Sequence, residues 1–342
     1  MSYKTFKLPK HYDPSKADNV FQVAYQNLEA DATEYRKDNN VQIAATDKYK
    51  IGLMVIDAQN TFCTPGYELY VQGAEKDNKR LSKFIYENLG YISKVFPTMD
   101  THTAYQIFHT AFFQDAQGNH PAPMTMITTD DIRSGKWEVN PGAAAGLGVS
   151  YTALKKHVLH YAEQLEAKGK YALTIWPYHA MLGGVGHALS SIIEEAVFFH
   201  SIARSSQAEI EIKGGNPLTE NYSVLSPEVL TTADGSPVAQ RNAKFIEKLI
   251  NLDVLIIAGQ AKSHCVAWTI DDLLSDIAQK DPALAQKVYL LEDCTSPVVA
   301  PGIIDFTEQA NEAFKRFAAA GMNIVQSTTP LDQWPGINQS KL

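Results

Sequence analysis

Six short apolar runs, each followed by turn residues, constrain the fold of this chain more than any other feature. They cover residues 50–59, 95–100, 208–215, 253–260, 287–294 and 322–328. Most are almost continuously apolar and rich in Val, Ile and Leu, which is typical of parallel strands buried on both faces. Helical patterns lie among them, over residues 76–95, 186–206, 239–252 and 265–279. The alternation predicts an α/β fold with three layers (α/β/α) and an open, mainly parallel sheet of about six strands.

Two segments do not fit this alternation. Residues 1–48 are polar and weakly helical, and we interpret them as an extension before the first strand. Residues 110–175 form a long insert with a predicted Gly/Ala-rich turn at 140–148 ("NPGAAAGLG") and a predicted helix at 150–170. Long insertions of this kind are usually functional or serve interactions. We expect one domain over residues 1–342, with the extension and the insert as additions to it. Either addition could form contacts between copies of the chain, so a homo-oligomer is one of the expected assemblies.

Charge and cysteine content narrow the range of partners and compartments. The formal net charge of −8 gives no basic surface for a nucleic acid or an anionic membrane. No apolar run approaches the roughly 20 residues that cross a bilayer, and the polar N-terminus lacks the core of a signal peptide. The three cysteines, Cys63, Cys265 and Cys294, are far apart and form no C-x-x-C pair. This usage suits a reducing cytoplasm.

Cys265 follows a predicted strand and a turn, and it begins a predicted helix. The free N–H groups and the dipole of a helix start favour a thiolate, so the sequence predicts a lowered thiol pKa. The same N–H groups are suited to holding an oxyanion. The alternative is a buried, inert cysteine, which is commoner among proteins in general.

Two charged residues end other predicted strands. Asp57 ends the run 50–59, where a carboxylate can act as a general base for a nearby thiol. Lys213 lies between an apolar strand and two glycines, where a cation can hold a thiolate and a carboxylate together. Taken singly, Asp57 is equally well explained as a turn or cap residue, and Lys213 as a solvated strand end.

A third group has the composition of a metal site. Asp100 and His102 lie two residues apart at a strand end, so their side chains can point to the same side. His179 is the third candidate ligand, and His109 is a candidate fourth. One carboxylate with two or three imidazoles suits a divalent metal, Zn²⁺ first and Fe²⁺ or Mn²⁺ as alternatives.

These separate motifs, in their order along the chain, resemble the nicotinamidase branch of the isochorismatase-like cysteine hydrolases. The matching stretches are "DAQNTFC" with Asp57, "DTH" with Asp100 and His102, "WPYH" with His179, "IKGG…ENYSVL" with Lys213 and Tyr222, and "AGQAKSHCVAWTIDD" with Cys265. They cover about half of the chain, and both the extension and the insert lie outside them.

The resemblance implies an amidohydrolase that converts nicotinamide, or a close heteroaromatic carboxamide, to the acid and ammonia. Cys265 would form a thioester, with Asp57 as base and Lys213 as supporting cation. Backbone N–H groups of Ala261 and Cys265 would form the oxyanion hole, at a turn with a cis Gln260–Ala261 bond. The metal would orient the ring of the substrate. The resemblance places the aromatic pocket walls at three further positions, Phe62, Trp176 and Tyr222.

This chain departs from the family pattern just before its cysteine. Lys262 and Ser263 replace the family's Thr-Asp, which predicts an extra cation beside the nucleophile. Such a cation would either lower the thiol pKa further or select a substrate with a negative group. Two alternatives to a nicotinamidase remain open at this level. One is a related cysteine hydrolase acting on a ureido, carbamoyl or other amide; the other is a descendant that binds a ligand without catalysis.

Overall fold

The computed structural model describes residues 3–169 and 171–342, and its centre is a six-stranded sheet. Each strand runs parallel to its neighbours. All six predicted runs contribute one strand each, so the predicted α/β class, sheet size and strand direction are confirmed. The strands are β1 (Ile51–Ile56), β2 (Ile92–Asp100), β7 (Glu211–Lys213), β8 (Val254–Gly259), β9 (Val288–Leu291) and β12 (Asn323–Val325).

The order of the strands decides where a ligand can bind. The order across the sheet is β12-β9-β8-β1-β2-β7. From β1 the chain builds outward through β2 and β7, and it then returns to the other side of β1 with β8. Open α/β sheets bind ligands at such a reversal, outside the carboxyl ends of the strands. The register places Asp100 opposite Lys213 and Ile56 opposite Gly259 at this edge.

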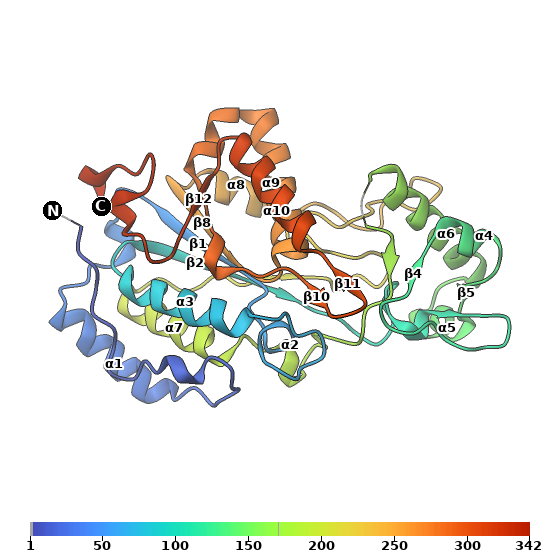
Figure 1. Ribbon diagram of the computed structural model, residues 1–342, viewed down its shortest axis with the longest axis horizontal. Coiled ribbons are helices and arrows are strands. Elements are labelled where there is room, and N and C mark those ends of the chain that lie inside the picture. Colours follow the sequence, from blue (N-terminus) through green and yellow to red (C-terminus); the bar gives the residue numbers. More distant parts are fainter. Residues whose placement is uncertain (1–2, 170) are drawn as a thin grey trace.

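Helices cover both faces of the sheet and complete the three predicted layers (Figure 1). Leu53 and Val55 of β1 pack into one apolar cluster with α1, α3 and α7, whereas Met54 and Ile56 pack into a second cluster with α8, α9 and α10. The strand is therefore buried on both faces, as its composition predicts. The helices of these layers are α1 (Tyr25–Asp38), α3 (Ala74–Glu87), α7 (Ser191–Ala203), α8 (Ala243–Ile250), α9 (Ala267–Lys280) and α10 (Thr307–Ala319).

For the helix predicted over residues 76–95, the predicted position of the C-terminal end was wrong. Helix α3 ends at Glu87, where the N–H of Asn88 bonds to the carbonyl oxygen of Phe84, and β2 already begins at Ile92. The apolar residues at 92–95 fit a helical period and a buried strand equally well, so periodicity alone cannot place this boundary. The polar extension contains α1, which packs on α7 through Leu28 and Ala32.

The insert forms a lobe at the right of Figure 1 with an apolar cluster of its own. The predicted turn at 140–148 was wrong: it contains helix α5, which Pro141 begins and which Asn140 caps by accepting a hydrogen bond from the Gly142 N–H. The predicted helix at 150–170 forms as α6 and ends at Ala167, and position 170 lies outside the described residues. That the whole chain is one domain with an insert stays a prediction. The elements of the insert are β3 (Phe113–Gln114), β4 (Met126–Ile127), α4 (Thr129–Arg133), β5 (Glu138–Val139), α5 (Pro141–Leu147), α6 (Tyr151–Ala167) and β6 (Leu173–Thr174).

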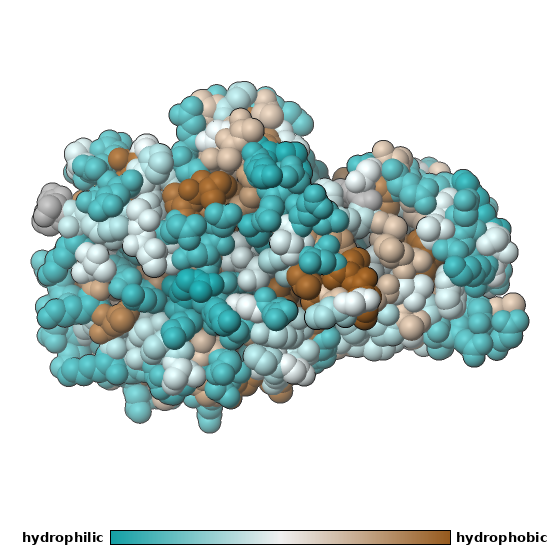
Figure 2. All heavy atoms as spheres, in the orientation of Figure 1, coloured by the Kyte–Doolittle hydropathy of each residue, from teal (hydrophilic) through white to brown (hydrophobic). Residues whose placement is uncertain are grey.

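A short hairpin lies between the main body and this lobe. Its strands are β10 (Val299–Ala300) and β11 (Ile304–Asp305), which pair antiparallel. Figure 2 shows an apolar patch over this hairpin, where Ile303 is 70% exposed. Within the described ranges, no helix is both long enough and apolar enough to cross a membrane.

The buried His200 in α7 predicts how stability depends on pH. Burial lowers the pKa of His200 to about 4, while its Nε2 lies 2.8 Å from the carbonyl oxygen of Ile92. The unfolded chain takes up a proton near pH 6.5 and the folded protein does not. His200 therefore destabilises the fold progressively as the pH falls from about 6.5 to about 4. Over this window His200 should cost the wild type on the order of 3 kcal/mol of unfolding free energy, and His200→Gln should not show this decrease. Urea unfolding at each pH measures both proteins. Equal pH profiles for the two proteins would contradict this.

Candidate active site

The carboxyl ends of β1, β2, β7 and β8 bring the predicted catalytic residues together. Asp57 follows β1, Asp100 ends β2, Lys213 ends β7, and Cys265 lies in a π-helical turn (Lys262–Val266) between β8 and α9. All four are buried, with exposed fractions of 7% or less. Residues that are up to 208 positions apart in the chain thus meet at the reversal of strand order.

The ammonium group of Lys213 is the centre of this cluster. Its Nζ lies 2.9 Å from Asp57 Oδ2, 3.0 Å from Asp100 Oδ1 and 3.5 Å from Cys265 Sγ. It also donates to the carbonyl oxygen of Asn221 at 2.8 Å. One buried cation therefore contacts the candidate base, the candidate nucleophile and a candidate metal ligand. The two carboxylates raise the pKa of Lys213 well above its usual range although burial opposes this, so the cation is maintained.

Asp57 is held in a conformation that few residues adopt. Its φ is +43°, in the left-handed region, which Asp tolerates better than most side chains. Thr98 fixes it twice: the hydroxyl donates to Asp57 Oδ1 at 2.5 Å and accepts from the Asp57 N–H at 3.1 Å. Burial raises the pKa of Asp57, and Lys213 only partly offsets this. Asp57 is therefore a stronger base than a solvated carboxylate.

Cys265 does not have the lowered pKa that its position at a helix start predicts. Burial raises the pKa of this thiol well above its usual range, and the charge of Lys213 opposes the shift without reversing it. The helix dipole and the Lys213 cation favour the thiolate, but complete removal of the thiol from water outweighs both. The resting nucleophile is therefore a neutral thiol, which needs a base to become reactive.

The predicted extra cation beside the nucleophile is also wrong. Lys262 points away from the thiol, toward α10: its Nζ lies 3.0 Å from Asn311 Oδ1, 3.3 Å from Glu292 Oε1 and 4.4 Å from the centre of the Phe314 ring. In the tight π-helical turn, side chains three residues apart leave in different directions. The side chain of Lys262 thus anchors this turn to α10 instead of facing the thiol.

The turn with the candidate oxyanion-hole residues has the cis bond that the resemblance implies. The Gln260–Ala261 peptide bond is cis, and Gly259 before it has a φ of +112°. A Cβ atom at Gly259 would lie 2.0 Å from the carbonyl oxygen of Ile56, so only glycine fits. Ala261 and Cys265 both line the cavity described below.

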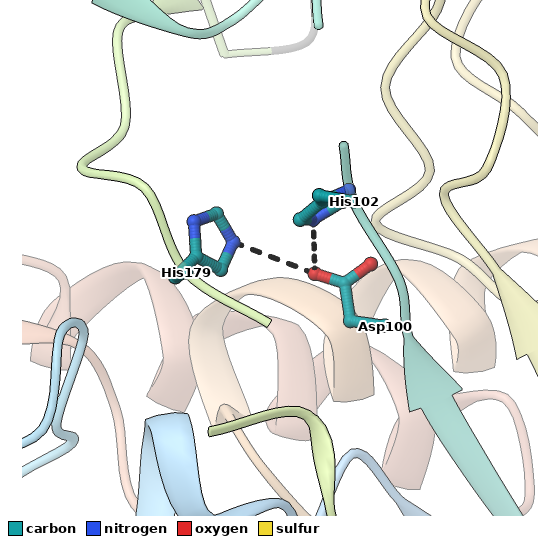
Figure 3. A group of neighbouring side chains, drawn as sticks. All are labelled: Asp100, His102 and His179. Atoms are coloured by element: carbon teal, nitrogen blue, oxygen red, sulfur yellow. Dashed lines mark hydrogen bonds and ion pairs between the residues drawn. The ribbon is translucent and has the colours of Figure 1, made fainter. Parts of the chain in front are cut away.

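Asp100, His102 and His179 form a buried group that could hold a metal ion (Figure 3). Their nearest ligand atoms all lie within 4.8 Å of one another, and both Nε2 atoms face Asp100 Oδ2, at 2.8 Å and 3.5 Å. The Nδ1 of each ring faces a backbone carbonyl oxygen, that of Gly214 for His102 and that of Pro177 for His179. This arrangement leaves both Nε2 lone pairs available for a metal.

Two further residues define the surroundings of this group. Gly214 has a φ of +83°, and a Cβ there would lie 2.7 Å from both Asp100 Oδ1 and His102 Cε1, so glycine keeps the site open. His109, the candidate fourth ligand, lies outside the group of three, with its ring centre 5.8 Å from that of His102 and 6.2 Å from that of His179. Its Nε2 is buried without a hydrogen-bond partner among the described residues. A role for His109 as ligand stays a prediction.

A narrow cavity connects the metal-binding group to the thiol. Asp100 and His179 of this group and Cys265 all line it. The three predicted pocket aromatics, Phe62, Trp176 and Tyr222, are in its wall, and the Trp176 Nε1–H donates to the Tyr222 hydroxyl at 3.0 Å. The lining residues are Phe62, Leu69, Val71, Asp100, Trp176, His179, Glu220, Tyr222, Ala261, His264, Cys265 and Val298.

Two titratable residues in this wall, Glu220 and His264, have no role assigned from the sequence, although His264 adjoins the candidate nucleophile. Burial raises the pKa of Glu220 to about 8, with a smaller contribution from Asp100. Glu220 lies in the "ENYS" stretch, two residues before the predicted Tyr222, and this proximity was the available signal. Burial lowers the pKa of His264 to about 3, so the ring is neutral; aromatic rings surround it, including that of Tyr171 at the end of the insert.

Replacing Lys213 should destabilise the protein strongly. Lys213→Met keeps the length of the side chain but leaves Asp57 and Asp100 buried without their shared counter-charge. Removing one partner of a buried ion pair typically costs about 3–5 kcal/mol, and we expect a loss of unfolding free energy in this range in urea titrations at neutral pH. Lys155→Met, which removes the exposed pair with Glu138, is the control and should change stability by less than about 1 kcal/mol. Equal effects of the two substitutions would contradict the central place of Lys213.

Comparison with known proteins supports the fold. No protein-family model and no curated protein matches the sequence. A nicotinamidase/pyrazinamidase of Acinetobacter baumanii matches structurally with a TM-score of 0.50 and 20% identity, over 82% of this chain and 97% of that one. Yeast nicotinamidase Pnc1p bound to the inhibitor nicotinaldehyde matches with a TM-score of 0.50 and 19% identity, over 81% and 99%. At these identities the likeness shows the fold alone, and it confirms the nicotinamidase-type fold that the motifs imply.

Proposed function

We propose that this protein is an amidohydrolase that cleaves the linear C–N bond of nicotinamide, or of a close heteroaromatic carboxamide, and releases ammonia. The observation that carries the proposal is the position of Lys213 Nζ, within 3.5 Å of Asp57, Asp100 and Cys265 at one end of a narrow aromatic cavity. A binding protein has no need for a base, a thiol and a buried cation in contact. The structural neighbours, a nicotinamidase/pyrazinamidase and a nicotinamidase bound to nicotinaldehyde, support the choice of substrate.

In the first half of the reaction, Asp57 takes the proton of the Cys265 thiol as Sγ attacks the carboxamide carbon. The carbonyl oxygen becomes an oxyanion, which the N–H groups of Ala261 and Cys265 stabilise. Asp57 then passes its proton to the leaving nitrogen, the C–N bond breaks, and ammonia departs from a thioester on Cys265. Lys213 stays charged throughout and stabilises the thiolate as it forms.

In the second half, Asp57 takes a proton from a water molecule that attacks the thioester carbon. The C–S bond breaks, the acid leaves, and the Cys265 thiol regains its proton from Asp57. The reaction as a whole converts one amide and one water to one acid and one ammonia. The raised pKa of Asp57 helps in both halves. It makes the carboxylate a better base, and it lets the protonated carboxyl keep its proton until the leaving nitrogen, or later the Cys265 sulfur, takes it.

Asp100, His102 and His179 would hold one divalent metal ion, with Zn²⁺ as first choice and Fe²⁺ or Mn²⁺ as alternatives. When bound, the ion would supply a Lewis-acid partner for the ring nitrogen of the substrate. The protein side chains do the rest of the positioning. Phe62, Trp176 and Tyr222 would confine a planar ring between apolar surfaces.

The test is ammonia release from a panel of amides by the purified protein, together with its metal content. We expect turnover of nicotinamide and pyrazinamide, with little or none of ureido and carbamoyl compounds. Turnover of ureido compounds without nicotinamide would overturn this choice of substrate in favour of a related cysteine hydrolase. Equal inactivity of the wild type and Cys265→Ala on the whole panel would indicate a ligand-binding protein instead.

A further inference from the structure

The side chain of Gln260 is buried at the oxyanion turn and connects it to two other parts of the chain. Its Nε2–H donates to Asp77 Oδ2 of α3 at 2.8 Å, and its Oε1 accepts from the Ser296 N–H at 3.3 Å. Gln260 is 0% exposed, and neither of these contacts belongs to the proposed catalytic steps. A buried primary amide with both ends bonded has one orientation only.

Asp77 fixes that orientation. It is 2% exposed; its Oδ1 accepts from Arg80 Nη2 at 2.7 Å, while Oδ2 accepts from Gln260. Burial raises the pKa of Asp77, and the bonds from Ser296, Gln260 and Arg80 work against this shift. Because the carboxylate oxygen can only accept, the NH₂ end of Gln260 must face Asp77 and its oxygen must face Ser296.

Ser296 then contacts the residues on both sides of Ala261, the side chain of Gln260 and the backbone of Lys262. Its N–H bonds to the side chain of Gln260, and its carbonyl oxygen accepts from the Lys262 N–H at 2.8 Å. The Gln260 N–H in turn donates to the carbonyl oxygen of Ile56 at 2.7 Å, next to the candidate base. These hydrogen bonds of Gln260 and Lys262, which we call the clamp, hold both neighbours of Ala261 and so fix the peptide that carries the Ala261 N–H.

We propose that Asp77 and Gln260 are positioning residues, which hold the Ala261 N–H in the direction that the oxyanion requires. The inference rests on the proposed amide hydrolysis and concerns its transition state. The Ala261 N–H contributes most when the carbonyl oxygen becomes an oxyanion. Loss of the clamp should therefore lower kcat and leave KM nearly unchanged.

The first experiment is a double-mutant cycle on nicotinamide hydrolysis. Gln260→Leu and Asp77→Leu should each lower kcat about 10- to 100-fold with KM within about threefold. The double variant should lose no more than either single variant, because both break the same clamp. Asp77→Asn keeps an acceptor oxygen for Gln260 and should recover most of the loss. If Gln260→Leu does not fold, Gln260→Asn, which is one methylene too short to reach both partners, replaces it.

The control removes a comparable buried hydrogen bond at the far end of the sheet. Ser93 accepts from the Ile51 N–H and donates to Asp47 Oδ2, away from the site. Ser93→Ala should leave both kinetic constants within about twofold of wild type. Wild-type kcat in a folded Gln260→Leu, or additive losses in the cycle, would overturn the proposal.

A second readout separates this proposal from the proposed function. Nicotinaldehyde has no leaving group: the Cys265 Sγ–C bond forms, the C=O double bond becomes a tetrahedral alkoxide, and the thiol proton passes to Asp57. We expect Gln260→Leu to weaken aldehyde binding about 10- to 100-fold while Cys265 alkylation by iodoacetamide stays within about twofold. A wild type that binds the aldehyde but hydrolyses no carboxamide would refute the function and still allow this test. Unchanged aldehyde affinity in Gln260→Leu would overturn the role of the clamp alone.

Discussion

Cys265→Ala is expected to abolish carboxamide hydrolysis, with kcat at least about 10⁴-fold below that of the wild type. The thiol is the only group of the cluster placed to form the acyl intermediate, and Lys213 and Asp57 are both in position to activate it. Ala removes the sulfur without adding bulk to a buried position. Ammonia release under saturating nicotinamide measures the effect, and thermal unfolding confirms that the variant is folded.

Two controls accompany this substitution. Metal content should equal that of the wild type, because Cys265 is not one of the three residues whose ligand atoms converge, Asp100, His102 and His179. Cys63→Ala is the matched cysteine control: burial raises the pKa of the Cys63 thiol well above its usual range, so it is unreactive and its loss should leave kcat within a few-fold. Substantial turnover by Cys265→Ala would rule out the thioester.

His102→Ala is expected to release the metal before any other effect. Its Nε2 is one of three convergent ligand atoms, and its Nδ1 is fixed by the carbonyl oxygen of Gly214. Altering groups that merely support a ligand costs 10- to 100-fold in metal affinity, so removing a ligand should cost more than about 100-fold. Metal analysis after dialysis against a weak chelator measures the loss. Nicotinamide turnover should fall with it, because the substrate ring loses its anchor.

His200→Gln is the appropriate comparison for this experiment. His200 in α7 is buried like His102, but it hydrogen-bonds to the carbonyl oxygen of Ile92 at the start of β2, away from the metal-binding group at the end of that strand. It should retain its metal through the same dialysis. Retention of metal by His102→Ala would show that His102 is not a ligand. Loss of metal from both variants would attribute the effect to an unstable fold instead.

Strand positions were the most predictable part of the fold. Most of the six strands lie in near-continuous apolar runs, and the alternation of these runs with helical patterns predicted the class, the sheet and its direction. The end of α3 was not predictable in this way, because Ile92 and Val95 satisfy both the helical and the strand pattern. Helix α5 was not predicted because its two glycines are typical of turns, whereas its alanines and the Asn140–Pro141 start favour a helix.

The candidate site was predictable where it depends on strand ends and motif spacing. Asp57, Asp100, Lys213 and Cys265 meet because parallel strands place their carboxyl ends at one edge. Burial was not predictable from one sequence, and it reversed the expected shift of the Cys265 pKa. The direction of Lys262 and the contact between Asp77 and Gln260 depend on how distant helices pack, which local patterns do not contain.

The most direct test of the account is mass spectrometry of protein quenched with acid during nicotinamide turnover. A thioester adds one pyridine-3-carbonyl group in place of the thiol hydrogen of Cys265. The account predicts this mass increase on the peptide that contains Cys265, and its absence from Cys265→Ala treated in the same way. Turnover with Cys265 unmodified at every quench time, or with the acyl group on another residue, would contradict it.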